Sequence, residues 1–126
     1  MVNAEGKRFL DEGADFRNYT YARYGRIILR QPGLFAWQVF DSTVIPLLRD
    51  EYRIAEVTKV KADSLQELAE GMDGVNAAGF LNTVAEFNAA VQIGTPFNPA
   101  VKDGRGTDGL EIPKSNWANP LNEPPF

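Results

Sequence analysis

The sequence predicts an α+β domain in which a small mixed sheet is covered by packed helices. Three stretches carry this prediction. Residues Ala77 to Ile93 place apolar side chains at helical spacing, residues Leu34 to Phe40 are rich in aromatic and β-branched residues, and residues Glu56 to Ala62 alternate like a strand. At 126 residues the chain can build one domain with its own core. We therefore expect a single domain over residues 1–126, with a core in residues 1–94 and an extended tail in residues 95–126.

The first half of the chain is predicted to contain a hairpin, a helix and a buried strand. Residues Val2 to Leu10 hold turn-forming Asn and Gly, which favours a short hairpin. Residues Phe16 to Arg30 contain no proline and end at Gln-Pro-Gly, which is typical of a helix followed by a stop. The buried strand follows at Leu34 to Phe40. Asp41 and Ser42 then open a short helix that carries Ile45 and two leucines.

The second half is predicted to contain an edge strand, two helices and the tail. Lysines in residues Glu56 to Ala62 would guard an exposed strand edge. Ser64 and Glu67 form a capping box, which predicts a short helix through about Glu70. The next helix, residues Ala77 to Ile93, presents the buried stripe Phe80, Val84, Phe87 and Val91 and includes Asn88 as a structural hydrogen-bonding residue. The tail holds six of the eight prolines, so it is expected to wrap the domain without adding elements.

Composition excludes several classes of function. The net charge is −4 and no run of Lys or Arg is long enough to follow a phosphate backbone, so nucleic acid is not expected as a partner. The chain has no Cys and no His, which excludes a disulfide, a Cys-based zinc site, a thiol nucleophile and a Ser-His-Asp triad, and no metal site is expected. Apolar stretches fall far short of the ~20 residues of a membrane span, and we expect a cytoplasmic protein.

Four ordered segments of the chain resemble a known family. They are VNAEGKRFLDEG near the start, ADFRNYTYARYGR, FLNTVAEFNAAV, and the tail VKDGRGT with PKSNWANPLNEPPF. Together they resemble the fumarate reductase and succinate dehydrogenase flavoprotein superfamily, and within it the FAD-dependent tricarballylate dehydrogenases. The resemblance implies a capping domain inserted into the FAD-binding domain of the same polypeptide. Such a cap closes over the flavin and a small polycarboxylate substrate.

The resemblance also separates this chain from a complete enzyme. No GxGxxG fingerprint follows a strand here, so the FAD-binding domain is expected to lie outside the chain. We therefore expect an FAD-dependent dehydrogenase only in the full-length protein, and an isolated fragment that binds no FAD and is inactive. The alternative is a free-standing small α+β binding domain that has no flavin chemistry.

Arg17 is the candidate catalytic residue. Helical steps place Arg17, Tyr21, Tyr24 and Ile28 on one stripe, whereas Arg23, Arg26 and Arg30 gather on the far side. Arg17 is thus expected to face inward, where a guanidinium needs a carboxylate partner. The family's active-site Arg follows the Val-Asn-x-x-Gly-x-Arg-Phe motif and a nearby acidic residue, which points to the same position. The alternative role is a structural ion pair with Asp11, Glu12 or Asp15.

Three further residues are candidates for substrate binding. Arg105 lies in the Gly-rich run Lys102 to Thr107 and could present its guanidinium to a polycarboxylate, although such a run is more typical of a turn. Lys114 begins the Lys-Ser-Asn-Trp motif, which the resemblance places near substrate, while Trp117 of that motif could equally anchor the tail to the core. The tyrosine hydroxyl of Tyr21 could contact substrate, although aromatic residues at helical spacing more often pack in a core.

Overall fold

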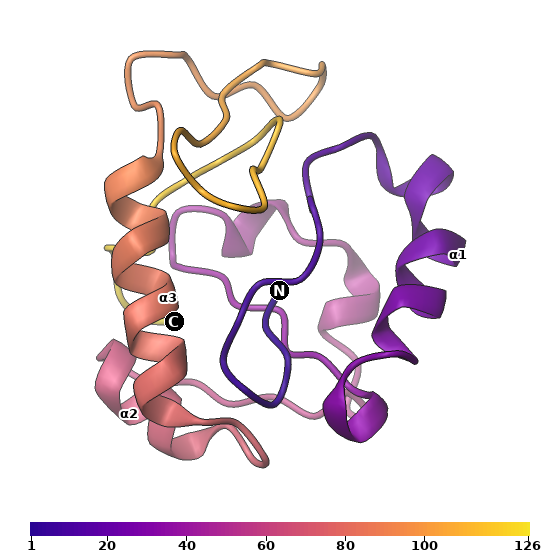
Figure 1. Cartoon of the computed structure of the whole chain (residues 1–126), viewed down its shortest axis with the longest axis vertical. Coiled ribbons are helices and arrows are strands. Elements are labelled where there is room, and N and C mark those ends of the chain that lie inside the picture. The colour runs from indigo at the N-terminus through magenta and orange to yellow at the C-terminus, as the bar shows by residue number, and fades with distance from the viewer.

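A computed structural model describes all 126 residues as a helical fold without a sheet. Three α-helices are separated by irregular chain and by three single turns of 3-10 helix. In order they are α1 (Arg17–Ile28), η1 (Pro32–Leu34), η2 (Ile45–Leu47), η3 (Asp50–Tyr52), α2 (Leu65–Gly71) and α3 (Ala77–Ala90). Figure 1 shows α2 and α3 together on one side of the molecule and α1 on the opposite side, with irregular chain between them.

The predicted α+β class is wrong, because neither candidate strand finds a partner along its length. Leu34 ends the η1 turn, and the extended residues after it make one isolated bridge, between Trp37 and Val2. In residues 56–62 only Ala62 pairs, exchanging backbone hydrogen bonds of 3.1 and 2.9 Å with Phe126. A strand is stabilised by neighbours on both sides, so aromatic and β-branched composition alone does not produce one. Each extended segment instead pairs through one residue only, Trp37 with Val2 and Ala62 with Phe126.

The predicted hairpin over Val2 to Leu10 is reduced to its turn. Asn3 accepts the backbone N–H of Gly6 at 2.9 Å and donates its own to Lys7 at 3.0 Å, but no ladder continues from there. The turn lies against the start of α3. Gly6 has a φ of +74°, and a Cβ at this position would lie 2.2 Å from the backbone nitrogen of Phe80. Only glycine therefore fits both the turn and the contact.

The three helices themselves are confirmed. The helix predicted over Phe16 to Arg30 is α1, and the predicted capping box forms at α2, where the Ser64 hydroxyl accepts the backbone N–H of Glu67 at 3.1 Å. The stripe predicted for α3 is buried as expected. However, α3 ends at Ala90 and not at Ile93, because Gln92 donates its backbone N–H to Gly106 of the tail at 3.0 Å. The short helix predicted after Asp41 is only the η2 turn.

The core lies around α2 and α3, and the tail completes it. The larger cluster consists of Val2, Leu68, Ala69, Met72, Phe80, Val84 and Phe126, and the smaller one of Phe87, Val91 and Ala118. Asn88 acts as the predicted hydrogen-bonding residue, since its side chain donates to the Leu121 carbonyl at 3.1 Å and accepts the Leu121 N–H at 2.8 Å. The tail therefore runs along α3 as a packed segment without regular structure.

Helix α1 is held much more loosely. Thr20 is its only buried residue, and the side chains of Tyr19 and Tyr21 are 79% and 62% exposed. The expectation that these two tyrosines pack in a core is therefore wrong. Among the helices, α2 and α3 form the extensive contact. None of the helices combines the length and the apolar character needed to cross a membrane.

Candidate functional site

A groove of about 680 Å³ separates α1 from the body of the molecule. Its walls come from the inner face of α1, from residues 38–52, from α3 and from the tail, and 18 of its 32 lining residues are hydrophobic. The predicted stripe of α1 faces this groove, since Arg17, Tyr21, Tyr24 and Ile28 all line it. The arginines predicted for the far side, Arg23, Arg26 and Arg30, are exposed and do not line it.

Arg17 occupies the first position of α1 at the edge of the groove. Its side chain is 52% exposed, so the expectation of an inward, buried guanidinium is wrong. The reason is that the inner face of α1 borders the groove and does not pack on the core. Its ion-pair partner is Glu51, at 3.9 Å, and not Asp11, Glu12 or Asp15. Exposed pairs contribute about 0–1 kcal/mol, so the guanidinium can exchange Glu51 for another carboxylate.

Tyr21 lies one helical turn after Arg17 on the same wall of the groove. The Arg17 guanidinium carbon is 6.0 Å from the centroid of its ring, the outer limit for an attraction between a cation and an aromatic face. The Tyr21 hydroxyl has no hydrogen-bond partner within the chain. Tyr24, one turn further, differs because its hydroxyl donates to the Asp11 carbonyl at 2.5 Å. Of the two, Tyr21 is the residue whose hydroxyl is free to contact a ligand.

Lys114 reaches the same groove from the tail. It is half-buried and forms no ion pair. Burial lowers the pKa of its ammonium group, the Glu12 carboxylate opposes that shift, and the Arg8 guanidinium adds to it. Its hydrogen-bond donors remain available because no protein acceptor takes them. The structure thus brings Arg17, Tyr21 and Lys114 to one groove.

A buried ion pair at the floor of the groove escaped the sequence analysis. Arg8 donates to Glu12 at 2.5 Å and to the Ile112 carbonyl of the tail at 2.5 Å, and its guanidinium carbon lies 5.3 Å from the Phe87 ring. Burial alone would raise the pKa of Glu12, but the amino group of Met1 and the Arg8 guanidinium together lower it to about 2. Local sequence gives no signal for the pair, because residues 8–12 are not helical and i,i+4 spacing brings side chains together only on a helix.

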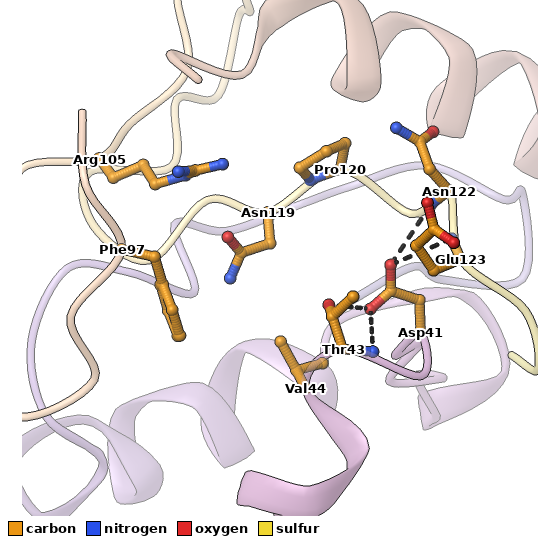
Figure 2. Close-up of a pocket in the computed structure, with 9 residues that line it drawn as sticks. All are labelled: Asp41, Thr43, Val44, Phe97, Arg105, Asn119, Pro120, Asn122 and Glu123. Atoms are coloured by element: carbon orange, nitrogen blue, oxygen red, sulfur yellow. Dashed lines mark hydrogen bonds between the residues drawn. The ribbon is translucent and has the colours of Figure 1, made fainter. Parts of the chain in front are cut away.

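Arg105 lines a second pocket, of about 290 Å³, that adjoins the groove (Figure 2). The two depressions share Asp41, Val44, Phe97, Asn119 and Pro120. The Arg105 guanidinium donates to the carbonyls of Ala118 at 2.7 Å and Thr95 at 2.9 Å. It has no carboxylate within 4.0 Å, although it already ties two parts of the tail together. Gly104 beside it has a φ of +68°, but residues 102–106 form no regular turn.

Asp41 forms the far end of this second pocket, and sequence reasoning assigned it only a helix start. Its side chain is 1% exposed. One carboxylate oxygen accepts the backbone N–H of Thr43 at 3.0 Å, and the other accepts those of Asn122 at 3.3 Å and Glu123 at 3.4 Å. Figure 2 shows it opposite Arg105, with the Asn119 amide between the two ends. Because its oxygens are already occupied, Asp41 joins the tail to residues 41–44 and is a structural residue.

The Ser-Asn-Trp residues of the tail motif lie against the segment that leads into α1. We call this contact the clasp. Ser115 donates its backbone N–H to Asp11 at 3.0 Å, Asn116 donates its side-chain amide to the Gly13 carbonyl at 2.8 Å, and the Trp117 ring packs on Phe16 with centroids 5.1 Å apart. The clasp consists of these three pairs: Asp11 with Ser115, Gly13 with Asn116, and Phe16 with Trp117. Its two segments run in the same direction, so the motif anchors the tail to the start of α1 beside the groove.

Comparison with known proteins finds sequence similarity to oxidoreductases. No protein-family model matches the chain, and no solved structure matches it. The chain is 30% identical over 102 residues to the probable fumarate reductase Ifc3 of Shewanella frigidimarina, which covers 75% of the chain and 15% of that protein. In an alignment 148 positions long, it is 31% identical to the 4-oxocyclohex-2-ene-1-carboxylate 5-dehydrogenase of Sinomonas cyclohexanicum, covering 99% of the chain and 23% of that protein.

A third relative is the 3-oxosteroid 1-dehydrogenase of Mycolicibacterium smegmatis, 31% identical over 112 residues, with 75% of the chain and 19% of that protein covered. The chain therefore spans between 15% and 23% of the length of these relatives. All three are oxidoreductases by name. The similarity supports the flavoprotein oxidoreductase superfamily that the four sequence segments resemble.

Proposed function

We propose that this chain is the capping domain of an FAD-dependent oxidoreductase that dehydrogenates a small polycarboxylate. The observation that carries the proposal is the groove, where Arg17 and Tyr21 from α1 and Lys114 from the tail face one apolar-walled space. Two cationic groups without strong partners, set among apolar side chains, suit a ligand with more than one carboxylate. The similarity to parts of three larger oxidoreductases supports the same role.

We propose that the residues of this chain do not by themselves form a site for FAD. A dinucleotide phosphate needs a helix start that is open and glycine-rich. The start of α3, which contains Gly79, is covered by the N-terminal turn: Asn76 donates its backbone N–H to Ala4 at 2.8 Å, and a Cβ at Gly79 would lie 2.3 Å from the Glu5 carbonyl oxygen. We therefore propose that FAD is bound by polypeptide outside these residues.

The proposed division of labour within the groove follows from the chemistry of each group. The planar guanidinium of Arg17 can hold a carboxylate by two parallel hydrogen bonds, and Lys114 can hold a second one as a point charge. Arg17 is also the proposed group for proton transfer at the reacting carbon. A free guanidinium is very difficult to deprotonate, so this transfer needs a relay. Glu12 is a poor relay base because the Arg8 guanidinium beside it lowers its pKa. The apolar walls exclude water around the substrate.

Tricarballylate is the substrate that the resemblance favours, and the pocket beside the groove offers a third carboxylate contact. Arg105 has no acidic partner there, so we propose that it binds the distal carboxylate of such a substrate. The names of the three relatives suggest alternatives to tricarballylate: fumarate, an oxocyclohexene carboxylate and a 3-oxosteroid. Two of these three carry carboxylates, as the cationic groove requires.

The test is made in a full-length protein that contains this chain. Bound FAD is quantified, and bleaching of its absorbance is followed with tricarballylate, succinate and a 3-oxosteroid under anaerobic conditions. We expect FAD to be bound and to bleach with tricarballylate. Arg17→Lys should keep the FAD content and lower kcat by at least about 10²-fold, with a smaller change in KM, because lysine loses the planar fork. Arg26→Lys, on the outer face of the same helix, is the matched control and should turn over normally.

Two outcomes would contradict the proposal. A protein that binds no FAD would favour a binding domain without flavin chemistry. Normal turnover in Arg17→Lys together with a lower melting temperature would assign Arg17 to the scaffold and leave Arg105 and Lys114 as the candidates for carboxylate binding.

A further inference from the structure

We propose that Trp117 is a positioning residue that fixes the start of α1 through Phe16 and so sets where the Arg17 guanidinium lies in the groove. The inference rests on the proposed function only for its catalytic consequence. Its structural part concerns how α1 is held, and it can be tested on this chain alone.

Helix α1 needs an external anchor. It has 12 residues, a length at which an isolated helix is marginal in water. Its N-cap residue, Phe16, provides no side-chain cap for the helix, and α1 shares no extensive contact with α2 or α3. Apart from the burial of Thr20, the position of its first turn therefore depends on what holds the residues immediately before it.

Trp117 provides the contact at that point. Its ring lies against Phe16, with centroids 5.1 Å apart and planes inclined by 49°. The indole N–H donates to the carbonyls of Val101 at 2.8 Å and Asn98 at 3.1 Å, and the backbone N–H donates to Asp103 at 2.9 Å. The ring is thus fixed from the tail side. Phe16 rests on an immobilised surface.

The backbone of Trp117 supports a specific task for its side chain. Its φ is +56°, in the left-handed region where glycine or asparagine is ordinarily found and a bulky residue is strained. The rest of the clasp and the contacts of the indole hold it there. Strain of this kind persists where surrounding contacts hold the residue in place, and it is concentrated at functional positions. Here the task is the contact with Phe16, one residue before Arg17.

The other anchors of α1 do not fix Arg17. The Tyr24 hydroxyl bonds to Asp11 two turns further along the helix, and the Arg17 pair with Glu51 is long, at 3.9 Å, between half-exposed side chains. Loss of the Trp117 ring should therefore loosen the first turn of α1 while leaving the core around α3 intact.

The decisive variant is Trp117→Gly, because glycine relieves the backbone strain while it removes the ring, which favours a folded protein. Amide hydrogen exchange of the 126-residue chain should be at least about tenfold faster for residues of the first turns of α1, while α3 is unchanged. Trp117→Phe should restore most of the protection because it keeps a ring against Phe16. The matched control is the other tryptophan, Trp37, which lies outside the groove and whose indole donates to Asp73 at 3.2 Å. Trp37→Phe should leave the exchange of α1 unchanged.

In the full-length enzyme, Trp117→Gly should lower kcat by about tenfold or more with a smaller effect on KM, and Trp117→Phe should recover it. Unchanged α1 exchange in Trp117→Gly would overturn the positioning role, whatever the activity. Faster exchange with unchanged kcat would instead overturn the catalytic role proposed for Arg17 and leave the positioning role in place.

Discussion

The two sides of this molecule are built by different means. The side that contains α2 and α3 buries a contiguous core, with Phe80 at 1% and Ala69 at 2% exposure. The side that contains α1 buries a single helical residue, Thr20, and is held by hydrogen bonds, one aromatic contact and exposed ion pairs. The first side resembles an ordinary domain core. The second presents a groove and the candidate site.

This difference shows where stability and function are separated in the chain. Apolar burial fixes the packed side, so its geometry tolerates little change. The α1 side borders an open, mostly apolar groove, which is the state expected of a surface that meets a ligand or another part of a larger protein. The following predictions test whether the two sides respond as differently as their construction implies.

The largest effect is expected from truncating the core on the packed side. Phe80→Ala should lower the free energy of unfolding by about 3–5 kcal/mol, because it removes a fully buried ring and leaves a cavity. Tyr19→Ala, at a side chain 79% exposed on α1, should change it by less than about 0.5 kcal/mol. Urea unfolding followed by circular dichroism measures both. Equal losses would show that α1 packs more tightly than its exposure indicates.

A smaller effect is expected at the joint between the two sides, from the Glu12 carboxylate. Its pKa is lowered from 4.5 to about 2, so the folded state favours the ionised form. The stabilisation is present above the unfolded pKa and is lost as the pH falls from about 4.5 through about 2. The shift corresponds to about 3 kcal/mol at neutral pH. Glu12→Gln should remove it and flatten the acid limb of the stability curve.

Exposed Glu111, which makes no hydrogen bond, is the control for this experiment. Glu111→Gln should leave the free energy of unfolding and its pH dependence as they are in the wild type. An acid limb that survives in Glu12→Gln would mean that other carboxylates cause the loss of stability below pH 4.5.

The smallest effect on stability is expected when a glycine is replaced by alanine, once in α1 and once in α3. A Cβ at Gly25 of α1 meets nothing within 4 Å, so Gly25→Ala should stabilise the protein by about 0.5–1 kcal/mol through helix propensity. A Cβ at Gly79 of α3 would lie 2.3 Å from the Glu5 carbonyl oxygen, so Gly79→Ala should destabilise it. Differential scanning calorimetry would resolve the opposite signs. A gain at both positions would show that the N-terminal turn is free to move away from α3.

The sequence predicts the helices because their signals are local. The Ser64 capping box, the stripe Phe80, Val84 and Phe87, and the proline-free run of α1 each lie within a few helical turns. The groove-facing stripe of Arg17 follows from the same periodicity. These predictions need no knowledge of what the elements pack against.

The sheet and the burial of Arg17 were wrong because both depend on distant partners. Residues 34–40 have strand composition, but their one bridge is to Val2, and no second strand lies beside them. The stripe of α1 that was predicted to face inward does point toward the body of the molecule. It borders the groove there and does not pack in the core. The bond from Arg8 to the tail and the clasp were missed because their two partners are far apart in the sequence, as for Ser115 and Asp11, which are separated by 104 residues.

That separation also governs the order in which the molecule can form during synthesis. Contacts within α2 and α3 are local and can form as soon as those residues emerge, whereas the clasp cannot close until Trp117 has left the ribosome. At elongation rates of about 5–20 residues per second, the 104 residues between Asp11 and Ser115 take roughly 5–20 s to make. For that interval the start of α1 lacks its contact with the tail, so this part of the molecule is among the last to be fixed.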